Sequence, residues 1–126
     1  MIKVAVFGNR NIDDEALVKA KLGEFINIAN IFEPLVILHG GAAGPAKIIS
    51  EYADGSHDWC SVLFKPWTKV WAKIDFKPIL FYLRNKQIVE NADIVCVITN
   101  NERDSEVFRV INLCKRWKKD LYIMEV

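Results

Sequence analysis

Short apolar runs, separated by glycine or polar segments, recur along the chain and predict five strands. Each run is nearly continuous and does not alternate with polar residues, which is typical of strands buried on both faces of a parallel sheet. The runs cover residues 2–7, 35–38, 61–64, 94–98 and 121–124. We therefore expect one mainly parallel, five-stranded sheet.

The segments between these runs carry apolar residues at helical spacing. A first helix is predicted over residues 13–32, with acidic residues at its start, where the helix dipole favours them. Its inward stripe would contain Val18, Leu22, Phe25, Ala29 and Phe32. A second helix is predicted from Gly44-Pro45 to about Ala53, since proline suits the first helical turn.

Two more helices are predicted in the second half of the chain, over residues 78–92 and 105–117. The inward stripe of the last helix would contain Val107, Val110, Ile111, Cys114 and Trp117. Strands and helices thus alternate from end to end, and parallel neighbours need crossover helices. The pattern predicts an α/β fold of the Rossmann-like, doubly wound kind, with helices on both faces of the sheet.

Composition narrows the class of protein. A length of 126 residues with 52% hydrophobic residues indicates one domain. Seventeen basic and sixteen acidic residues leave a charge of +1, which argues against affinity for a nucleic-acid polymer. Cys60, Cys96 and Cys114 have no C-x-x-C spacing and an odd count, so we expect reduced thiols in a cytoplasmic protein and no metal site. No cofactor is expected. The first apolar run is too short for a membrane span, and no membrane association is expected.

Ligands of open α/β sheets bind beyond the carboxyl ends of the strands, where the strand order reverses. This rule selects four loops, at residues 8–10, 39–44, 65–67 and 99–105. The second loop, His39-Gly40-Gly41-Ala42-Ala43-Gly44, lets backbone amides approach an anion at the start of a helix. It is neither a full G-x-G-x-x-G nor a Walker A sequence, and a tight turn packed against the sheet is the alternative.

Individual side chains near these loops add candidate chemistry. Arg10 and Arg84 could bind a phosphate or carboxylate bidentately, although a single arginine more often forms a surface ion pair. His39 could act on a ligand or could simply be hydrogen-bonded at the end of its strand. Trp67, within the long loop at residues 65–77, could stack on a base or cover the edge of the core.

A basic run, Lys115-Arg116-Trp117-Lys118-Lys119, closes the last predicted helix. Cations are favoured at a helix C-terminus by the dipole. We therefore interpret it as a solvated helix end and not as a nucleic-acid patch.

Four segments taken together resemble a known family. They are Phe7-Gly8-Asn9-Arg10, His39 to Gly44, Pro66-Trp67, and Arg84-Asn85 followed by Ala92-Asp93. In this order they resemble the SLOG superfamily, in particular its small YspA/YpsA-like branch, whose relatives include the Smf/DprA DNA-processing proteins and the Lonely Guy phosphoribohydrolases. The resemblance covers almost the whole chain. It implies a Rossmann-like domain that binds nucleotides or nucleotide-derived ligands, often as a homodimer or higher oligomer.

The resemblance also implies which residues contact the ligand. Ser105 stands near the family's glycine-threonine step, and its hydroxyl could cap the last helix and still bond a phosphate. The expected ligand-binding residues are Gly8, Asn9, Arg10, His39, Gly40, Gly41, Ala42, Gly44, Trp67, Arg84, Asn85 and Ser105.

Departures from the family pattern concern catalysis. Many small relatives read glycine-alanine-aspartate where this chain has Gly44-Pro45-Ala46, and the position of the glutamate in active hydrolases is held by Phe108. Glu106 and Asp104, and more remotely Glu102, remain as candidate carboxylates without support from spacing. Two functions stay open: a module that binds a signalling nucleotide or ADP-ribose derivative unchanged, which we favour, and an N-glycosidase that cleaves the base from ribose. Binding of single-stranded DNA is weaker, because the net charge is near zero.

Overall fold

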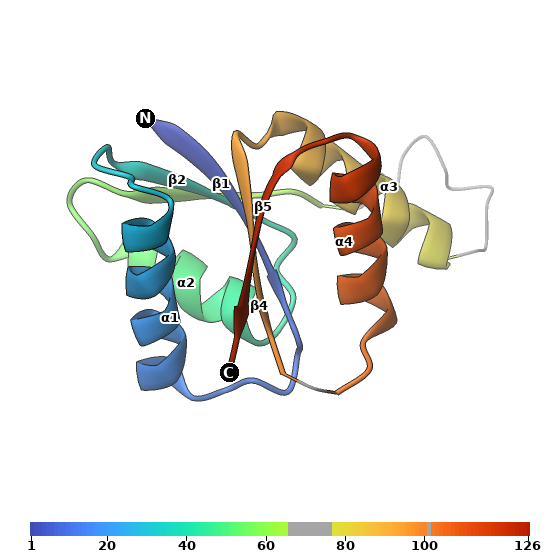
Figure 1. The fold of residues 1–126 in the computed structure, drawn as a ribbon, viewed down its shortest axis with the longest axis horizontal. Helices are drawn as coiled ribbons and strands as arrows, with labels where there is room; N and C mark the ends of the chain where they lie inside the picture. The colour runs from blue at the N-terminus through green and yellow to red at the C-terminus, as the bar shows by residue number, and fades with distance from the viewer. Residues whose placement is uncertain (66–76, 101) are drawn as a thin grey trace.

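The computed structural model describes residues 1–65, 77–100 and 102–126. Five strands form one parallel sheet in the order β3-β2-β1-β4-β5 (Figure 1), which confirms the predicted fold class. The strands are β1 (Ile2–Gly8), β2 (Leu35–His39), β3 (Cys60–Leu63), β4 (Ile94–Thr99) and β5 (Asp120–Glu125). The helices are α1 (Glu15–Ile28), α2 (Pro45–Asp54), α3 (Lys77–Asn91) and α4 (Ser105–Arg116).

Helices cover both faces of the sheet in pairs. Figure 1 shows α1 and α2 on one side and α3 and α4 on the other. From β1 to β3 successive strands are added toward one edge of the sheet, and β4 and β5 are added toward the other edge. Right-handed crossovers therefore place the two pairs of helices on opposite faces. Alternate β1 side chains serve the two cores: Val4 and Val6 pack with α1 and α2, and Ala5 and Phe7 with α3 and α4.

The first helix ends earlier than predicted. Asn30 adopts a left-handed φ of 57°, its N–H bonds the Asn27 carbonyl at 3.2 Å, and the Ile31 N–H bonds the Ile26 carbonyl at 3.1 Å. This Schellman-type ending turns Ile31 into the core and leaves Phe32 88% exposed. The expected inward position of Phe32 was wrong, because apolar spacing alone does not locate a helix end.

The third strand is an edge strand, which its apolar run did not indicate. Val62 and Leu63 are 42% and 48% exposed, so the expectation of burial on both faces was wrong. β5 forms the opposite edge of the sheet. An apolar run predicts a strand, but its place in the sheet depends on pairing between distant segments.

The three cysteines are free thiols, and burial raises the pKa of Cys96 to about 12. No helix in the described parts of the chain has the length and apolar character needed to cross a membrane.

Candidate functional site

Two loops meet where the strand order reverses, after β1 and after β4. The buried side chain of Asn9 joins them. Its Oδ1 accepts hydrogen bonds from the Thr99 hydroxyl at 2.6 Å and the Asn100 N–H at 3.2 Å, and its Nδ2 donates to the Glu102 carbonyl at 3.2 Å. Asn9, expected to bind a ligand, therefore uses its amide to hold the two loops together.

Glycines allow the loop before α2 to pack against the end of β1. Gly44, at the N-cap of α2, has φ 92° and ψ −147°, and a Cβ there would lie 2.6 Å from the Asn9 carbonyl oxygen. A Cβ on Gly8 would lie 2.5 Å from both the Ile98 carbonyl oxygen and Pro45 Cγ. Close packing thus explains these two glycines, in line with the tight-turn alternative.

Arg84 occupies the space over the loop before α2, residues 39–44, which we call the glycine turn. Its buried guanidinium donates to the Gly40 carbonyl at 3.1 Å and to Asn85 Oδ1 at 3.1 and 3.0 Å, and it lies 5.0 Å from the centre of the Phe81 ring. A Cβ on Gly40 would lie 2.5 Å from its Cζ. Burial lowers the pKa of Arg84, Glu106 opposes that shift, and Arg10 adds to it.

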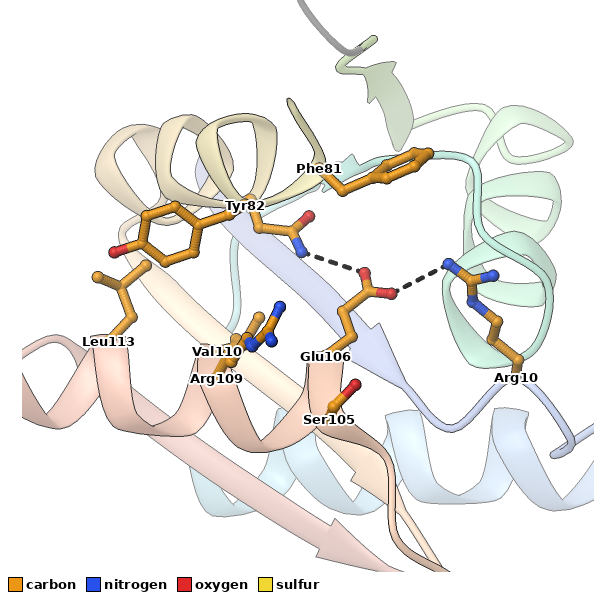
Figure 2. A pocket seen from close by; sticks show the side chains of 9 residues that line it. Arg10, Phe81, Tyr82, Ser105, Glu106, Arg109, Val110 and Leu113 are labelled. Carbon is orange, nitrogen blue, oxygen red and sulfur yellow. Dashed lines mark hydrogen bonds and ion pairs between the residues drawn. The ribbon is translucent and has the colours of Figure 1, made fainter. Parts of the chain in front are cut away.

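Glu106 connects Arg84 to Arg10. Its Oε1 accepts from Asn85 Nδ2 at 3.1 Å and pairs with Arg84 Nη2 at 3.4 Å. Its Oε2 pairs with Arg10 Nη2 at 3.1 Å (Figure 2). We refer to Arg10, Arg84, Asn85 and Glu106 as the arginine–glutamate cluster. The cluster brings together residues from the β1–α1 loop, α3 and α4, three of which the sequence had singled out as ligand-binding residues.

A pocket of about 200 Å³ opens beside the cluster, between α3 and α4 (Figure 2). Its lining residues are Arg10, Phe81, Tyr82, Asn85, Ser105, Glu106, Arg109, Val110 and Leu113. The crevice over Gly8 and Gly40 holds only about 10 Å³, room for about one water molecule, because Arg84 fills it. Of these two spaces, the one between α3 and α4 is the larger, and the crevice at the glycine turn is too small for a ligand.

Sequence reasoning missed five of these lining residues as site residues: Phe81, Tyr82, Arg109, Val110 and Leu113. The inward spacing of Arg84 and Asn85 with Ile88 and Val89 on the predicted third helix could have indicated that the polar pair is buried. A buried arginine needs a carboxylate partner.

A second pocket of about 470 Å³ lies beside α4 and the loop after β4. Its walls include Glu102, Asp104, Ser105 and Phe108. The Asp104 carboxylate caps α4, accepting from the Glu106 and Val107 amides at 2.9 and 3.2 Å. The expected cap by Ser105 was therefore wrong: the aspartate at the preceding position bonds the free amides, and Ser105 borders both pockets.

His39 is buried at the carboxyl end of β2. Its Nδ1 accepts a hydrogen bond from the Gly41 N–H at 3.1 Å, so the neutral ring carries its proton on Nε2. Burial lowers the pKa of His39, the positive charge of Arg84 lowers it further, and Asp54 partly opposes the shift. The hydrogen bond matches the structural alternative left open for this residue, and it also commits the Gly41 amide.

We expect protonation of His39 to destabilise the fold. Because the pKa is lower in the folded state, this residue contributes nothing above its unfolded pKa of about 6.5, and stability falls as the pH drops below that value, by at most about 1.4 kcal/mol per pH unit. In His39→Asn an amide oxygen can accept the Gly41 N–H without titrating. Urea unfolding of this variant at neutral and mildly acidic pH should show a weaker pH dependence than the wild type.

His57, which is exposed, provides the matched control. His57→Asn should keep the pH dependence of the wild type. If the stability of His39→Asn depends on pH as strongly as that of the wild type, His39 does not cause the pH dependence.

The expectation for Trp67 lies outside the described residues, as do residues 66–76 of the loop at 65–77.

The basic run lies at the end of α4. Lys115 and Arg116 are in its last turn, where the dipole favours cations, and Lys86 Nζ lies 5.6 Å from the centre of the Trp117 ring. Neither Lys115 nor Arg116 lines the pocket between α3 and α4.

The strand order and the paired helix layers define a protein of the Rossmann-like, doubly wound α/β class. Comparisons with protein-family models, curated proteins and solved structures find no match to this chain. Because one fold of this kind serves many functions, what the protein does has to follow from the chemistry of its site.

Proposed function

We propose that the chain binds a nucleotide-derived small molecule in the pocket between α3 and α4 and leaves it unchanged. The observation that carries this proposal is the pocket's lining, which combines a fixed carboxylate with aromatic rings and exposed guanidinium groups (Figure 2). Phe81 and Tyr82 supply faces for a base, and Arg10 and Arg109 supply bidentate donors for a phosphate. Glu106 can accept hydrogen bonds from sugar hydroxyls.

In this proposal the glycine turn supports the site. The Gly40 carbonyl accepts a hydrogen bond from Arg84, and the lack of a Cβ at Gly40 leaves space for the Arg84 guanidinium. Arg84 and Asn85 in turn hold Glu106. The turn thus fixes the carboxylate that faces the ligand. Support of this kind keeps a binding site rigid.

An N-glycosidase is the second candidate, favoured by the position of Glu106. A carboxylate near the ribosyl carbon would stabilise the oxocarbenium-like state formed as the base leaves. Of the three candidates, Asp104 caps α4 and Glu102 lines the second pocket, where its carboxylate accepts a hydrogen bond from Asn11. Glu106 alone among them lines the pocket between α3 and α4.

Both candidates make a direct test possible. The purified protein is incubated with nucleotides, dinucleotides and ADP-ribose, examined by native mass spectrometry, and the small molecules are then analysed for released base. An intact bound molecule supports the binding function. Released base that disappears in Glu106→Gln supports the glycosidase, and the absence of both binding and release contradicts both.

Tyr82 tests the predicted stacking of the base. Its partly exposed ring lines the pocket, and loss of base stacking costs about 1–3 kcal/mol. We expect Tyr82→Ala to weaken binding of the nucleotide found above by about tenfold, measured by calorimetry. Phe108→Ala, which removes an exposed ring from the second pocket, is the control and should leave affinity unchanged. The reverse pattern would place the ligand in the second pocket.

A further inference from the structure

We propose that the Arg10–Glu106 ion pair closes the ligand's phosphate subsite. A phosphomonoester would take the place of Glu106 at Arg10 and be bound by Arg10 and Arg109, while Glu106 stays with Arg84 and Asn85. This inference rests on the proposed function, and it adds where the phosphate lies and which contact it replaces.

The two oxygens of Glu106 have different partners. Oε1 faces Asn85 and Arg84, and only 4% of the Arg84 side chain is exposed. Oε2 faces Arg10, whose side chain is 59% exposed. Arg84 cannot leave Glu106 without stranding a buried charge, whereas Arg10 can turn toward solvent at little cost. The contact with Arg10 is therefore the one that exchanges.

The charges around the pocket match a phosphomonoester. Arg84 and Glu106 compensate each other, which leaves the positive charges of Arg10 and Arg109. Arg109 follows Glu106 by one helical turn, and it forms no ion pair with any residue that the structure describes. Figure 2 shows its guanidinium reaching toward the same space as the Glu106 carboxylate. A phosphomonoester carries nearly two negative charges at neutral pH.

The glycine crevice is unsuited to the phosphate. It has room for about 10 Å³, and the guanidinium of Arg84 already fills the space over Gly40. The Gly41 N–H, which could have bonded an anion, donates to His39. An anion therefore finds donors at the outer side of the cluster.

A double-mutant cycle tests the exchange, with ribose 5-phosphate as the probe and ribose as the phosphate-free control. By titration calorimetry we expect Arg10→Gln to bind ribose 5-phosphate about tenfold more weakly than the wild type, since a charge-assisted bond is lost. Glu106→Gln should bind about tenfold more tightly. In the Arg10→Gln background, the gain from Glu106→Gln should shrink to about twofold or less.

Other outcomes overturn the inference. An equal gain in both backgrounds would mean that Glu106 acts by repulsion alone. Weaker binding of ribose 5-phosphate by Glu106→Gln would mean that the bonds of its carboxylate to the sugar outweigh any competition with the phosphate for Arg10. Arg116→Gln, on an exposed residue of α4 outside the pocket, is the control and should change nothing.

A measurement on the wild type removes the dependence on folding of the variants. Ribose 5-phosphate should shift the side-chain NMR signals of Arg10 and Arg109 and leave that of Arg84 in place. A shift of Arg84 without Arg10 would put the phosphate in the glycine crevice and overturn the inference. Failure of every nucleotide to bind overturns the proposed function, whereas nucleotide binding without any response of Arg10 overturns only the exchange.

Discussion

Gly44→Ala is expected to destabilise the protein by about 3–5 kcal/mol. The backbone at Gly44, with φ 92° and ψ −147°, lies in a region that is almost restricted to glycine. The new Cβ would also lie 2.6 Å from the Asn9 carbonyl oxygen. Pro45 and Asn9 cannot move easily to relieve this contact, because Pro45 begins α2 and the side chain of Asn9 bonds the loop after β4.

Urea unfolding followed by circular dichroism measures this effect, and Gly23→Ala is the matched control. Gly23 lies inside α1, and a Cβ there would meet no atom within 4 Å. Alanine at that position should stabilise the protein by about 1 kcal/mol. A loss of less than about 1 kcal/mol in Gly44→Ala would show that the start of α2 can rearrange.

Arg84→Met is expected to cost about 2–4 kcal/mol. Methionine fills a similar volume, but it leaves Glu106 without its buried partner and the Gly40 carbonyl without its donor. Removing one member of a buried ion pair typically costs about 3–5 kcal/mol, and the 26% exposure of the Glu106 side chain reduces that cost.

The double variant Arg84→Met with Glu106→Gln separates the charge from the packing. Because it removes the stranded carboxylate, it should recover part of the stability lost in Arg84→Met, as measured by urea unfolding. Arg116→Met, at an exposed position, should stay within about 0.5 kcal/mol of the wild type. If the double variant is no more stable than Arg84→Met, the cluster acts through packing and not through charge.

Local chemistry made much of the fold predictable from the sequence. The five apolar runs became the five strands, and Gly44-Pro45 marked the start of α2 because proline loses no hydrogen bond there. The early end of α1 was not predicted because the left-handed residue that ends the helix is an asparagine, Asn30, and not the more usual glycine.

The site was predictable only in part. Arg10, Arg84 and Asn85 could be named in advance, yet Glu106 could not be separated from Asp104 by spacing alone. The distinction depends on which carboxylate bonds the free amides of α4, and Asp104 does so from the N-cap. Tyr82 and Arg109 face one pocket because α3 and α4 pack side by side, a relation between helices that the pattern within either one does not contain.

The Asn9 side chain also has a consequence for the speed of ligand exchange. By joining the loops after β1 and β4, it keeps the backbones that carry Arg10 and Glu106 in a fixed relation. Opening the proposed phosphate subsite would then need only the rotation of the exposed Arg10 side chain, a motion of picoseconds to nanoseconds, and not a loop movement of microseconds or longer. Association should therefore follow a single fast phase whose rate is limited by diffusion and falls with added salt.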